Sequence, residues 1–431
     1  MTNTHEIRLR ETGTMTRLGR TGLVAIGILL LGACDTDVIN PGNVDDKSLN
    51  DRGAQPALVR GAGRAIGQGL NWLSYTGAAV TREIHPAGST GSFGITPDWQ
   101  NGILILTDED LDDHWELSQR GRWVAEETVR RIDAAGPLNA NTHQQALLFA
   151  GFSNRILGDN MCEAVFDGGP AEPNAKYWER AEAFFTQAIA IQSGAMQTAA
   201  YGGRAQARVF LGKWNEALAD AANVPTVFVF NQPYYNVGED TQRNRIFYSS
   251  GNTRESGSAY RAHTQWNTWH HAYREATGDP RVPIQFTNEV GDAAIQCCGK
   301  VPFWPQNKHP SSAAPIRLVS GREMRLIEAE AKLRNNDVVG AMTSINAVRT
   351  AAGAPLVVAA DATEAWRLLK RERGIELWLE GRRIADLRRW KDGNTPGALD
   401  PLEVPGGASH LTQQDLCFPI SKSERDTNPN F

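Results

Sequence analysis

The sequence lacks a basic surplus, a long hydrophobic run and any abundance of cysteine. Its 431 residues hold 44 Lys and Arg against 49 Asp and Glu, which gives a formal net charge of -5. Proteins that bind nucleic-acid backbones need a basic surface, so this balance argues against nucleic acid as a partner. The hydrophobic content of 41% excludes a disordered chain. The glycines and prolines follow no period, which excludes a collagen-like repeat.

Common catalytic and cofactor-binding motifs are also missing. There is no Gly-x-Ser-x-Gly elbow, no His-Glu-x-x-His and no Gly-x4-Gly-Lys-[Ser/Thr] loop. Residues 61–67 resemble a dinucleotide-binding loop, but no strand precedes them and the glycine spacing is one residue too long, so they are interpreted as part of a helix or its entry. No Cys-x-x-Cys or histidine-rich spacing indicates zinc. We therefore expect no cofactor, no metal and no catalytic residue.

The only strongly apolar run, residues 23–31, is far shorter than the roughly twenty residues that span a bilayer. It follows Arg17 and Arg20 and is typical of the apolar region of a signal peptide. The next residues, Leu31-Gly32-Ala33-Cys34, resemble a bacterial lipobox. This pattern predicts that residues 1–33 are removed, from Met1 or from a start at Met15, and that a lipidated Cys34 anchors the chain to a membrane. The alternative is a soluble secreted protein with an incidental cysteine.

Four cysteines follow Cys34 and can form two disulfides in an oxidising compartment. Cys162, Cys297, Cys298 and Cys417 allow three connectivities. A bridge between the adjacent Cys297 and Cys298 is conceivable, but we expect pairing elsewhere to be preferred.

Apolar residues recur mostly at helical spacing, with strand-like alternation only in short stretches such as 103–106 and 226–230. Small and aromatic residues repeat at the spacing of tetratricopeptide helix pairs. The sequence predicts a mostly α fold of such pairs, about 110–225 and 316–431, with a long irregular insertion, about 226–315, that forms a ligand-binding lobe. The positions that carry the repeat are Thr142 to Leu157 with Trp178, Ala181, Phe185 and Ala188; Tyr201, Ala205, Gly212, Trp214, Ala217 and Ala221; Ala329, Ala341, Ile345 and Val348; and Gly374 and Gly381.

Three charged or titratable groups have two interpretations each. The acidic run 108–113 is typical of the first turn of a helix, with a calcium loop as the alternative. Glu372, Glu376 and Glu380 lie four residues apart among many arginines, which favours ion pairs over acid-base catalysis. The pair at 270–271 is interpreted as a surface histidine cluster rather than as metal ligands.

Twelve tryptophans are the most informative surplus. Those at repeat positions are expected to pack in the core, namely Trp178, Trp214, Trp366, Trp378 and Trp390. Aromatic rings on irregular segments can stack on the C–H faces of sugars while neighbouring polar groups bind the hydroxyls. The candidate ligand-binding residues are therefore Trp72, Tyr75, Trp99, Trp266, Trp269 and Trp304.

Several motifs together resemble one family, the RagB/SusD-like nutrient-binding outer-membrane lipoproteins. Asp279-Pro280-Arg281 is similar to the family's "DPR" turn, and Ser421 stands where its final "PIP" motif has proline. The resemblance keeps order and spacing from about residue 34 to 431, although the chain is shorter than many members. The other matching stretches are 315–331, 344–353, 372–390, 418–420 and 428–430.

The resemblance implies a non-catalytic protein, lipid-anchored at the outer membrane and facing the cell exterior. Such a protein captures oligosaccharides and delivers them to a TonB-dependent SusC-like transporter, with the helix pairs contacting the barrel and the lobe presenting the ligand. Three alternatives stay open. The cargo can be a peptide or another nutrient, the protein can be a secreted helical glycoside hydrolase, or the helix pairs can bind protein alone.

Overall fold

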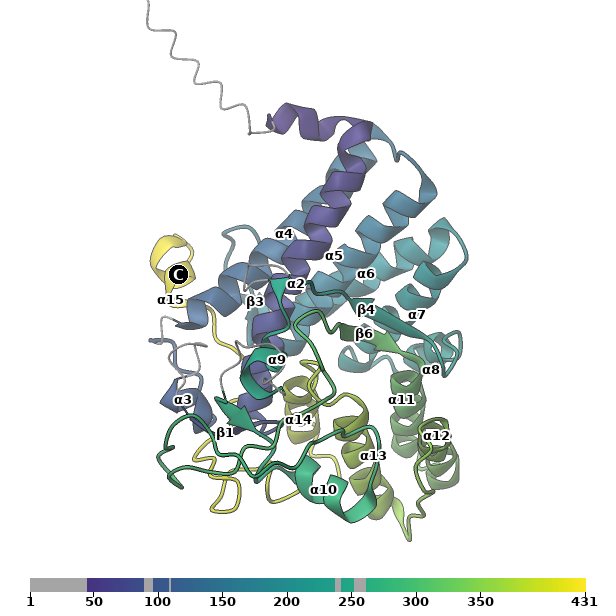
Figure 1. The fold of residues 1–431 in the computed structure, drawn as a ribbon. Helices are drawn as coiled ribbons and strands as arrows, with labels where there is room; N and C mark the ends of the chain where they lie inside the picture. Colours follow the sequence, from purple (N-terminus) through teal and green to yellow (C-terminus); the bar gives the residue numbers. More distant parts are fainter. Residues whose placement is uncertain (1–44, 89–95, 108–109, 237–241, 252–260) are drawn as a thin grey trace, which may run out of the picture. The chain divides into compact units, whose positions relative to one another are not determined.

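A computed structural model describes residues 45–88, 96–107, 110–236, 242–251 and 261–431 (Figure 1). The chain divides into Met1–Asp46 and Lys47–Phe431, and the arrangement given below is that of the second unit. The lipobox cysteine Cys34 lies outside the described residues. Among the described helices, none combines the length and the apolar character needed to cross a bilayer.

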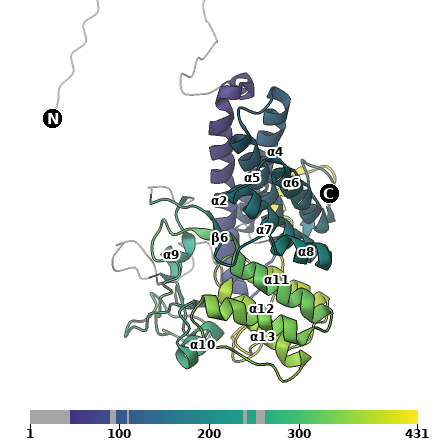
Figure 2. The same ribbon diagram turned by 90° about the vertical axis from the view of Figure 1, so that its right-hand side faces the viewer.

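The first half of the unit is a row of helices, each packed against the next. Two short 3-10 turns, η1 (Asp46–Asn50) and η2 (Arg52–Ala54), precede it. The first long helix packs on the second and third, and from there each helix contacts its successor. Both ribbon views show these helices side by side (Figure 2). They are α2 (Gln55–Val80), α4 (Asp110–Ala135), α5 (Ala140–Asn160), α6 (Ala175–Ile191), α7 (Ala195–Phe210) and α8 (Trp214–Ala221).

The helices begin where the sequence supplies caps or negative charge. The Asn139 side chain accepts a hydrogen bond from the Thr142 backbone amide at 2.9 Å and so starts α5. Asp110, Asp112 and Asp113 occupy the first turn of α4, which confirms the helix-start interpretation for the described part of the acidic run. Residues 61–67 lie inside α2, as expected.

Small residues allow α5, α6 and α7 to approach closely. A Cβ atom on Gly151 would lie 2.6 Å from the Phe185 ring, and one on Gly203 would lie 2.4 Å from it. Phe185 itself is fully buried between these helices. The predicted helix-pair packing is confirmed here, because only a glycine leaves room for the ring at both positions.

The last part of the chain repeats the same architecture around a second apolar cluster. The first helix of this part contacts the next two and also reaches back to α8. Leu326, Ile345 and Trp366 are among the residues buried between them. The elements are β6 (Ile316–Ser320), α11 (Gly321–Arg334), α12 (Val338–Ala351), α13 (Ala362–Glu376), α14 (Arg383–Asp392) and α15 (Lys422–Thr427).

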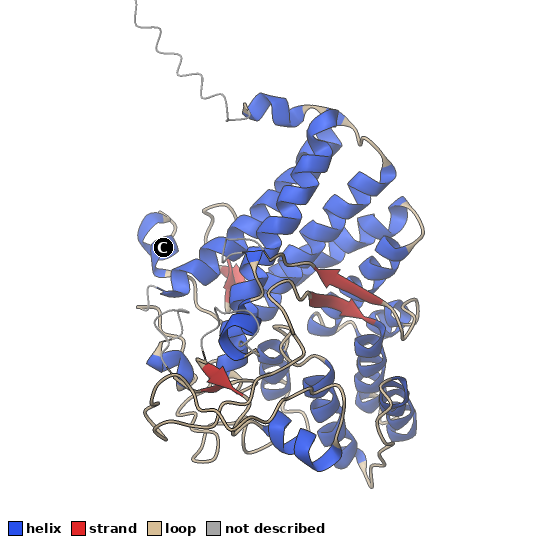
Figure 3. Ribbon diagram, viewed as in Figure 1, coloured by secondary structure: helices blue, strands red, loops and turns tan. Residues whose placement is uncertain are grey.

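The insertion lies between the two helical parts. Its first and last segments run next to each other where the chain leaves the first helical part and enters the second. Strand β4 (Val229–Gln232) pairs antiparallel with β6, with Val229 opposite Ser320. The insertion has little regular structure and contains α9 (Arg245–Ser250), β5 (His263–Thr264) and α10 (Trp269–Thr277) (Figure 3). Strand β1 (His85–Pro86), from the segment after α2, pairs with β5 and so joins that segment to the insertion. The remaining short elements are α3 (Pro97–Gln100), β2 (Glu163–Ala164) and β3 (Glu172–Pro173).

One of the two predicted strand-like stretches is not a strand. Residues 103–106 form no strand because their backbone is paired locally: the Ile103 amide bonds the Asp98 carbonyl at 2.9 Å, and the Leu104 amide bonds an Asp415 carboxylate oxygen at 2.7 Å. The second stretch overlaps β4. Alternating apolar residues in a short segment do not distinguish a strand from a buried extended loop.

The expectation about disulfides is wrong for the adjacent cysteines. Cys162 at the end of α5 pairs with Cys417 across 255 residues, and Cys297 pairs with Cys298. The reason is local geometry, because the Cys162 amide donates to the Phe418 carbonyl at 2.9 Å and so places Cys417 opposite it. That pairing leaves the two neighbours only each other.

Candidate ligand-binding site

The structure divides the six predicted ligand-binding aromatics by burial. Tyr75 and Trp99 are 0% exposed, and Trp269 is 3% exposed. Trp72 is half-buried, and the Arg245 guanidinium lies 3.4 Å from its ring centre. In this conformation these four rings have little free surface to offer a sugar.

Each of the buried rings anchors an irregular segment to a helix. Trp99 from α3 and Trp72 from α2 both meet His114 edge-on, at ring-centre distances of 5.1 and 5.2 Å. Tyr75 meets His263 of β5 in the same way at 5.4 Å. Trp72 and Tyr75 therefore lie on a helix and not, as was expected, on an irregular segment, while the contacts of Trp99 and Tyr75 fix α3 and β5 to the core.

The histidine pair next to Trp269 is not a surface cluster. His270 is fully buried, its Nε2 lies 3.1 Å from the Gly374 carbonyl, and its ring stacks on Trp378 at 5.3 Å. Burial lowers the pKa of His270 well below its usual value. Only His271 remains half-buried, so the surface interpretation is wrong for His270, because α10 turns that side chain toward the helices.

The other two predicted residues, Trp266 and Trp304, are half-buried and lie in one part of the insertion. The hydroxyl of Thr264 accepts hydrogen bonds from the backbone amides of both, at 3.1 and 2.8 Å. Residues 38 positions apart in the sequence are thereby held next to one strand, β5. The structure thus brings this pair together and separates it from the four others.

Trp304 belongs to an aromatic cluster that we call the lobe aromatic cluster: His271, Phe286 and Trp304. The Trp304 ring lies 4.3 Å from His271 and 5.4 Å from Phe286, and Phe286 lies 5.6 Å from His271. Phe286 is 51% exposed, so the cluster presents apolar ring surface to solvent. Sequence reasoning missed Phe286 and set aside His271, since a single phenylalanine in a loop carries no signal of exposure.

A pocket of about 270 Å³ lies between the segment after α2, α3 and the insertion. We call it the disulfide pocket, because Cys297 lines it together with Arg82, Gln100, Asn101 and His410. Arg82 donates from Nη2 to the Gln100 carbonyl at 2.9 Å, while its Nε and Nη1 have no hydrogen-bond partner among the described residues. Burial lowers the pKa of this guanidinium to about 9. The pocket therefore offers polar donors of the kind that bind hydroxyl or carboxylate oxygens.

A second pocket, of about 280 Å³, lies between α2 and the start of the insertion. Its lining combines aromatic rings and polar side chains, including Phe149, Tyr234, Tyr235 and Gln145. Tyr234 is buried and donates from its hydroxyl to the Gly67 carbonyl at 2.8 Å, whereas Tyr235 is exposed. No sequence motif marks this pocket, and it was not predicted.

Comparisons with known proteins agree with this architecture. The model of the SusD family matches residues 322–431. The unit resembles a SusD superfamily protein from Bacteroides vulgatus, with 15% identity, a TM-score of 0.63, and coverage of 88% of this chain and 98% of the other. The described unit has a SusD-like fold. The predicted resemblance and the mostly helical fold are thereby confirmed.

Two further solved structures are similar to this SusD-like chain. One is surface glycan-binding protein A from Bacteroides uniformis, with 16% identity, a TM-score of 0.63, and coverage of 87% and 98% of the two chains. The other was solved with xylogluco-oligosaccharide, with 14% identity, a TM-score of 0.61, and coverage of 88% and 97%. No curated protein sequence matches the chain significantly.

A buried network of cations and carboxylates joins the part that matches the SusD family model to residues that precede it. The network includes the three predicted glutamates. Glu372 pairs with Arg281 at 2.8 Å and with Arg349, and Glu376 pairs with Arg317 at 2.8 Å. Glu380 pairs with Lys308 at 2.6 Å and with Arg317. The ion-pair interpretation of these SusD-like motif residues is confirmed, and their carboxylates are occupied by structural partners.

Proposed function

We propose that this chain is a lipid-anchored binding protein that captures oligosaccharides outside the cell. It delivers them to a TonB-dependent SusC-like transporter in the outer membrane. The SusD-like fold supports this proposal, and so do two structural neighbours, one named for surface glycan binding and one solved with an oligosaccharide. The protein acts by capture and release, without breaking a bond.

The observation that carries the proposal is the lobe aromatic cluster. The rings of Phe286 and Trp304 lie 5.4 Å apart in the irregular lobe, and Phe286 is 51% exposed, so ring surface faces solvent there. Rings that are fixed by backbone bonds bind with little loss of conformational entropy, because their positions are set before the ligand arrives. Stacking of sugar faces on these rings, with hydroxyls bound by nearby polar groups, fits the chemistry of an oligosaccharide.

The anchoring part of the proposal rests on the lipobox at residues 31–34. Two acyl chains on Cys34 suffice for stable attachment to a membrane. The charge network supports the non-catalytic part, because the clustered glutamates of α13 and the turn after it are neutralised by arginine and lysine rather than poised as an acid and a base.

Calorimetry with residues 35–431 tests the capture step. The ligands are xyloglucan oligosaccharides, other neutral oligosaccharides and peptide digests, and the variants are Trp304→Ala and Phe286→Ala. We expect at least one oligosaccharide to bind and each variant to weaken it by about tenfold or more, as removal of a central aromatic contact does. Trp123→Ala is the matched control, because Trp123 is 52% exposed on α4, outside the lobe.

Three outcomes contradict the proposed site or cargo. Binding that survives both lobe variants moves the site away from the cluster, and binding lost only in Trp123→Ala moves it to α4. Binding of peptides alone changes the cargo. Cleavage of any oligosaccharide in the panel makes the protein an enzyme, which mass spectrometry of the recovered ligand detects.

A separate measurement tests delivery. Affinity-tagged chain is crosslinked in intact outer membranes, and the crosslinked partner is identified by mass spectrometry. We expect a TonB-dependent barrel, and oligosaccharide uptake that falls when the chain is removed. Uptake that is independent of the chain contradicts the delivery step even where capture holds.

A further inference from the structure

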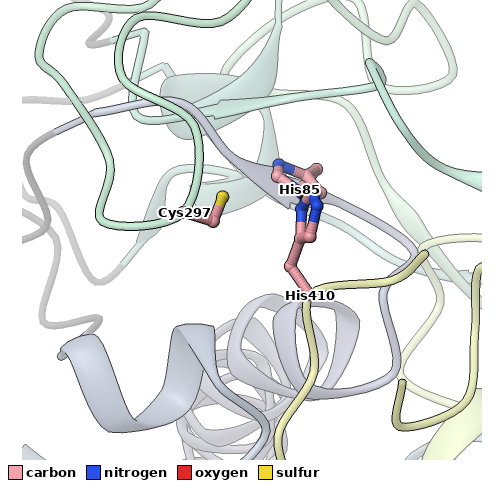
Figure 4. A group of neighbouring side chains, drawn as sticks. All are labelled: His85, Cys297 and His410. Atoms are coloured by element: carbon pink, nitrogen blue, oxygen red, sulfur yellow. Dashed lines mark hydrogen bonds between the residues drawn. The ribbon is translucent and has the colours of Figure 1, made fainter. Parts of the chain in front are cut away.

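Three distant parts of the chain place metal-ligating side chains at the disulfide pocket. His85 comes from β1, Cys297 and Cys298 from the insertion, and His410 from the loop after α14. One ligand atom each from His85, Cys297 and His410 lies within 4.8 Å of the others. Figure 4 shows the two imidazole rings close together, with Cys297 beside them. We propose that His85, His410, Cys297 and Cys298 form a redox-gated zinc site, which binds the ion only when the disulfide between the two cysteines is reduced.

The spacing of the ligand atoms fits tetrahedral zinc. His85 Nε2 lies 3.3 Å from His410 Nδ1, and Cys298 Sγ lies 3.5 Å from the same nitrogen. With Zn–N bonds of about 2.05 Å and Zn–S bonds of about 2.3 Å at tetrahedral angles, two ligand nitrogens are about 3.3 Å apart and a nitrogen and a sulfur about 3.5 Å apart. The two imidazoles and the Cys298 sulfur therefore already have the separations that the ion requires, and the two sulfurs move apart when the disulfide is reduced.

The protonation of His85 is also that of a zinc ligand. Its Nδ1 lies 2.8 Å from the Pro86 carbonyl, so this nitrogen carries the proton and Nε2 presents its lone pair toward His410. Zinc-bound histidines commonly donate their other ring N–H to a backbone carbonyl in this way.

The two cysteines are held at the tip of a tight turn. Ile295 and Gly299 form an isolated antiparallel bridge, in which the Ile295 amide bonds the Gly299 carbonyl at 2.9 Å. Gly299 has φ +67°, a left-handed conformation that glycine adopts without strain. The turn fixes Cys297 and Cys298 at the pocket whether or not they are bonded to each other.

The disulfide is the gate, because a disulfide sulfur is a poor ligand and carries no charge. With the bond closed, the site offers the ring nitrogens of His85 and His410 alone, and the positive charge of Arg82, which lines the pocket with His410, opposes a cation. A thiol reductant opens the bond by disulfide exchange, which supplies two electrons and two protons and leaves two thiols. Zinc then displaces both thiol protons, and the two thiolates balance its double charge.

Zinc titration of residues 35–431 tests the site directly. The chain is titrated with Zn²⁺ against a chromophoric chelator before and after treatment with a reductant, which is then removed without air. We expect one ion per reduced chain, bound roughly 100-fold or more tighter than by the oxidised chain, because reduction adds two ligands. Co²⁺ in place of Zn²⁺ is expected to give a thiolate charge-transfer band.

Variants separate this site from other thiols and histidines. Cys297→Ser/Cys298→Ser keeps the Cys162–Cys417 disulfide and is expected to abolish the effect of reduction. His410→Ala, in a half-buried loop, is expected to weaken binding by roughly tenfold or more. His143→Ala is the control, because His143 lies on α5 and pairs with Asp133 of α4, and it is not one of the four proposed ligands. Thermal melting confirms that each variant is folded.

Two results overturn the proposal. The first is zinc affinity that does not change on reduction. The second is a reduction-dependent affinity that persists in Cys297→Ser/Cys298→Ser, which assigns the ion to Cys162 and Cys417 instead. Neither result depends on whether the protein binds oligosaccharide.

Discussion

The C-terminal helices and the inserted lobe differ in which residues they bury: the helices bury paired charges, and the lobe leaves aromatic rings partly exposed. In α11 to α14 charged side chains are buried and paired, as in Arg373 with Asp386 at 2.7 Å, where both side chains are 2% exposed. The lobe has little regular structure and keeps aromatic rings partly in solvent. The difference teaches that the motifs shared with the SusD family record how the helices pack, whereas the rings proposed to bind the ligand lie outside those motifs.

Ion pairs join the lobe to the C-terminal helices. Arg281 of the lobe pairs with Asp279 at 2.6 Å and with Glu372 of α13 at 2.8 Å. Lys308 reaches Glu380 in the turn after α13 at 2.6 Å. The scaffold carboxylates thus hold the lobe in place, and this explains why the "DPR" turn stands out in a region that is otherwise hard to align.

The largest contrast is expected between the two disulfides, of which one joins the first helical part to the C-terminal loop and the other lies within the lobe. Cys162→Ala/Cys417→Ala opens a loop of 255 residues and is expected to lower the free energy of unfolding by up to about 5 kcal/mol, because the unfolded chain regains the entropy of that loop. Cys297→Ser/Cys298→Ser opens almost no loop, so this variant is expected to change the free energy of unfolding little. Urea unfolding of both variants measures the contrast, and similar losses contradict it.

Removal of the lobe-to-scaffold ion pair is expected to have the next largest effect. Arg281→Ala leaves Asp279 and Glu372 buried with one partner fewer each, which costs about 3–5 kcal/mol in comparable buried pairs. Arg367→Ala on α13, whose pair with Glu364 is much more exposed, is the control and is expected to cost less than about 1 kcal/mol. Guanidinium unfolding followed by tryptophan fluorescence measures both. A variant that unfolds in two steps, lobe first, sharpens the comparison by showing that the regions separate.

The smallest expected effect is the pH dependence of stability that comes from one buried carboxyl, Glu83, just after α2. Burial raises the pKa of Glu83 to about 7, although the Leu379 amide donates to its Oε1 at 3.0 Å. Folding favours the neutral form of Glu83. The resulting contribution to the free energy of unfolding is complete below about pH 4.5 and is lost as the pH rises to 7. The total loss is on the order of 3 kcal/mol at about 1.4 kcal/mol per pH unit.

Glu83→Gln removes this titration while keeping a carbonyl acceptor for Leu379. The free energy of unfolding at pH 8 relative to pH 5 is expected to fall less in the variant than in the unchanged chain. Glu179→Gln, at an exposed pair on α6, is the control. Equal pH dependence in all three proteins contradicts the role given to Glu83.

The two helical parts could be predicted from the sequence, because residue spacing along one helix indicates which side chains pack against its neighbours. The glycines and alanines near Phe185 and the glutamates of α13 follow helical spacing, and each contacts what that spacing implies. The exposure of a loop aromatic is set instead by residues far away. Trp99 is covered through His114 of α4, and Trp266 and Trp304 are joined only through Thr264. No local pattern encodes such contacts, and the pairing of Cys297 with Cys298 was missed for the same reason.

The disulfide arrangement also bears on how the chain is made. Synthesis proceeds from the N-terminus, so of the four disulfide-bonded cysteines Cys162 is made first, Cys297 and Cys298 follow, and Cys417, the partner of Cys162, is made last. Cys162 therefore meets two wrong thiols before the right one exists. Once Cys297 and Cys298 are bonded to each other, neither thiol can compete with Cys417 for Cys162. The adjacent pair thereby limits wrong pairing of Cys162 while the disulfides form.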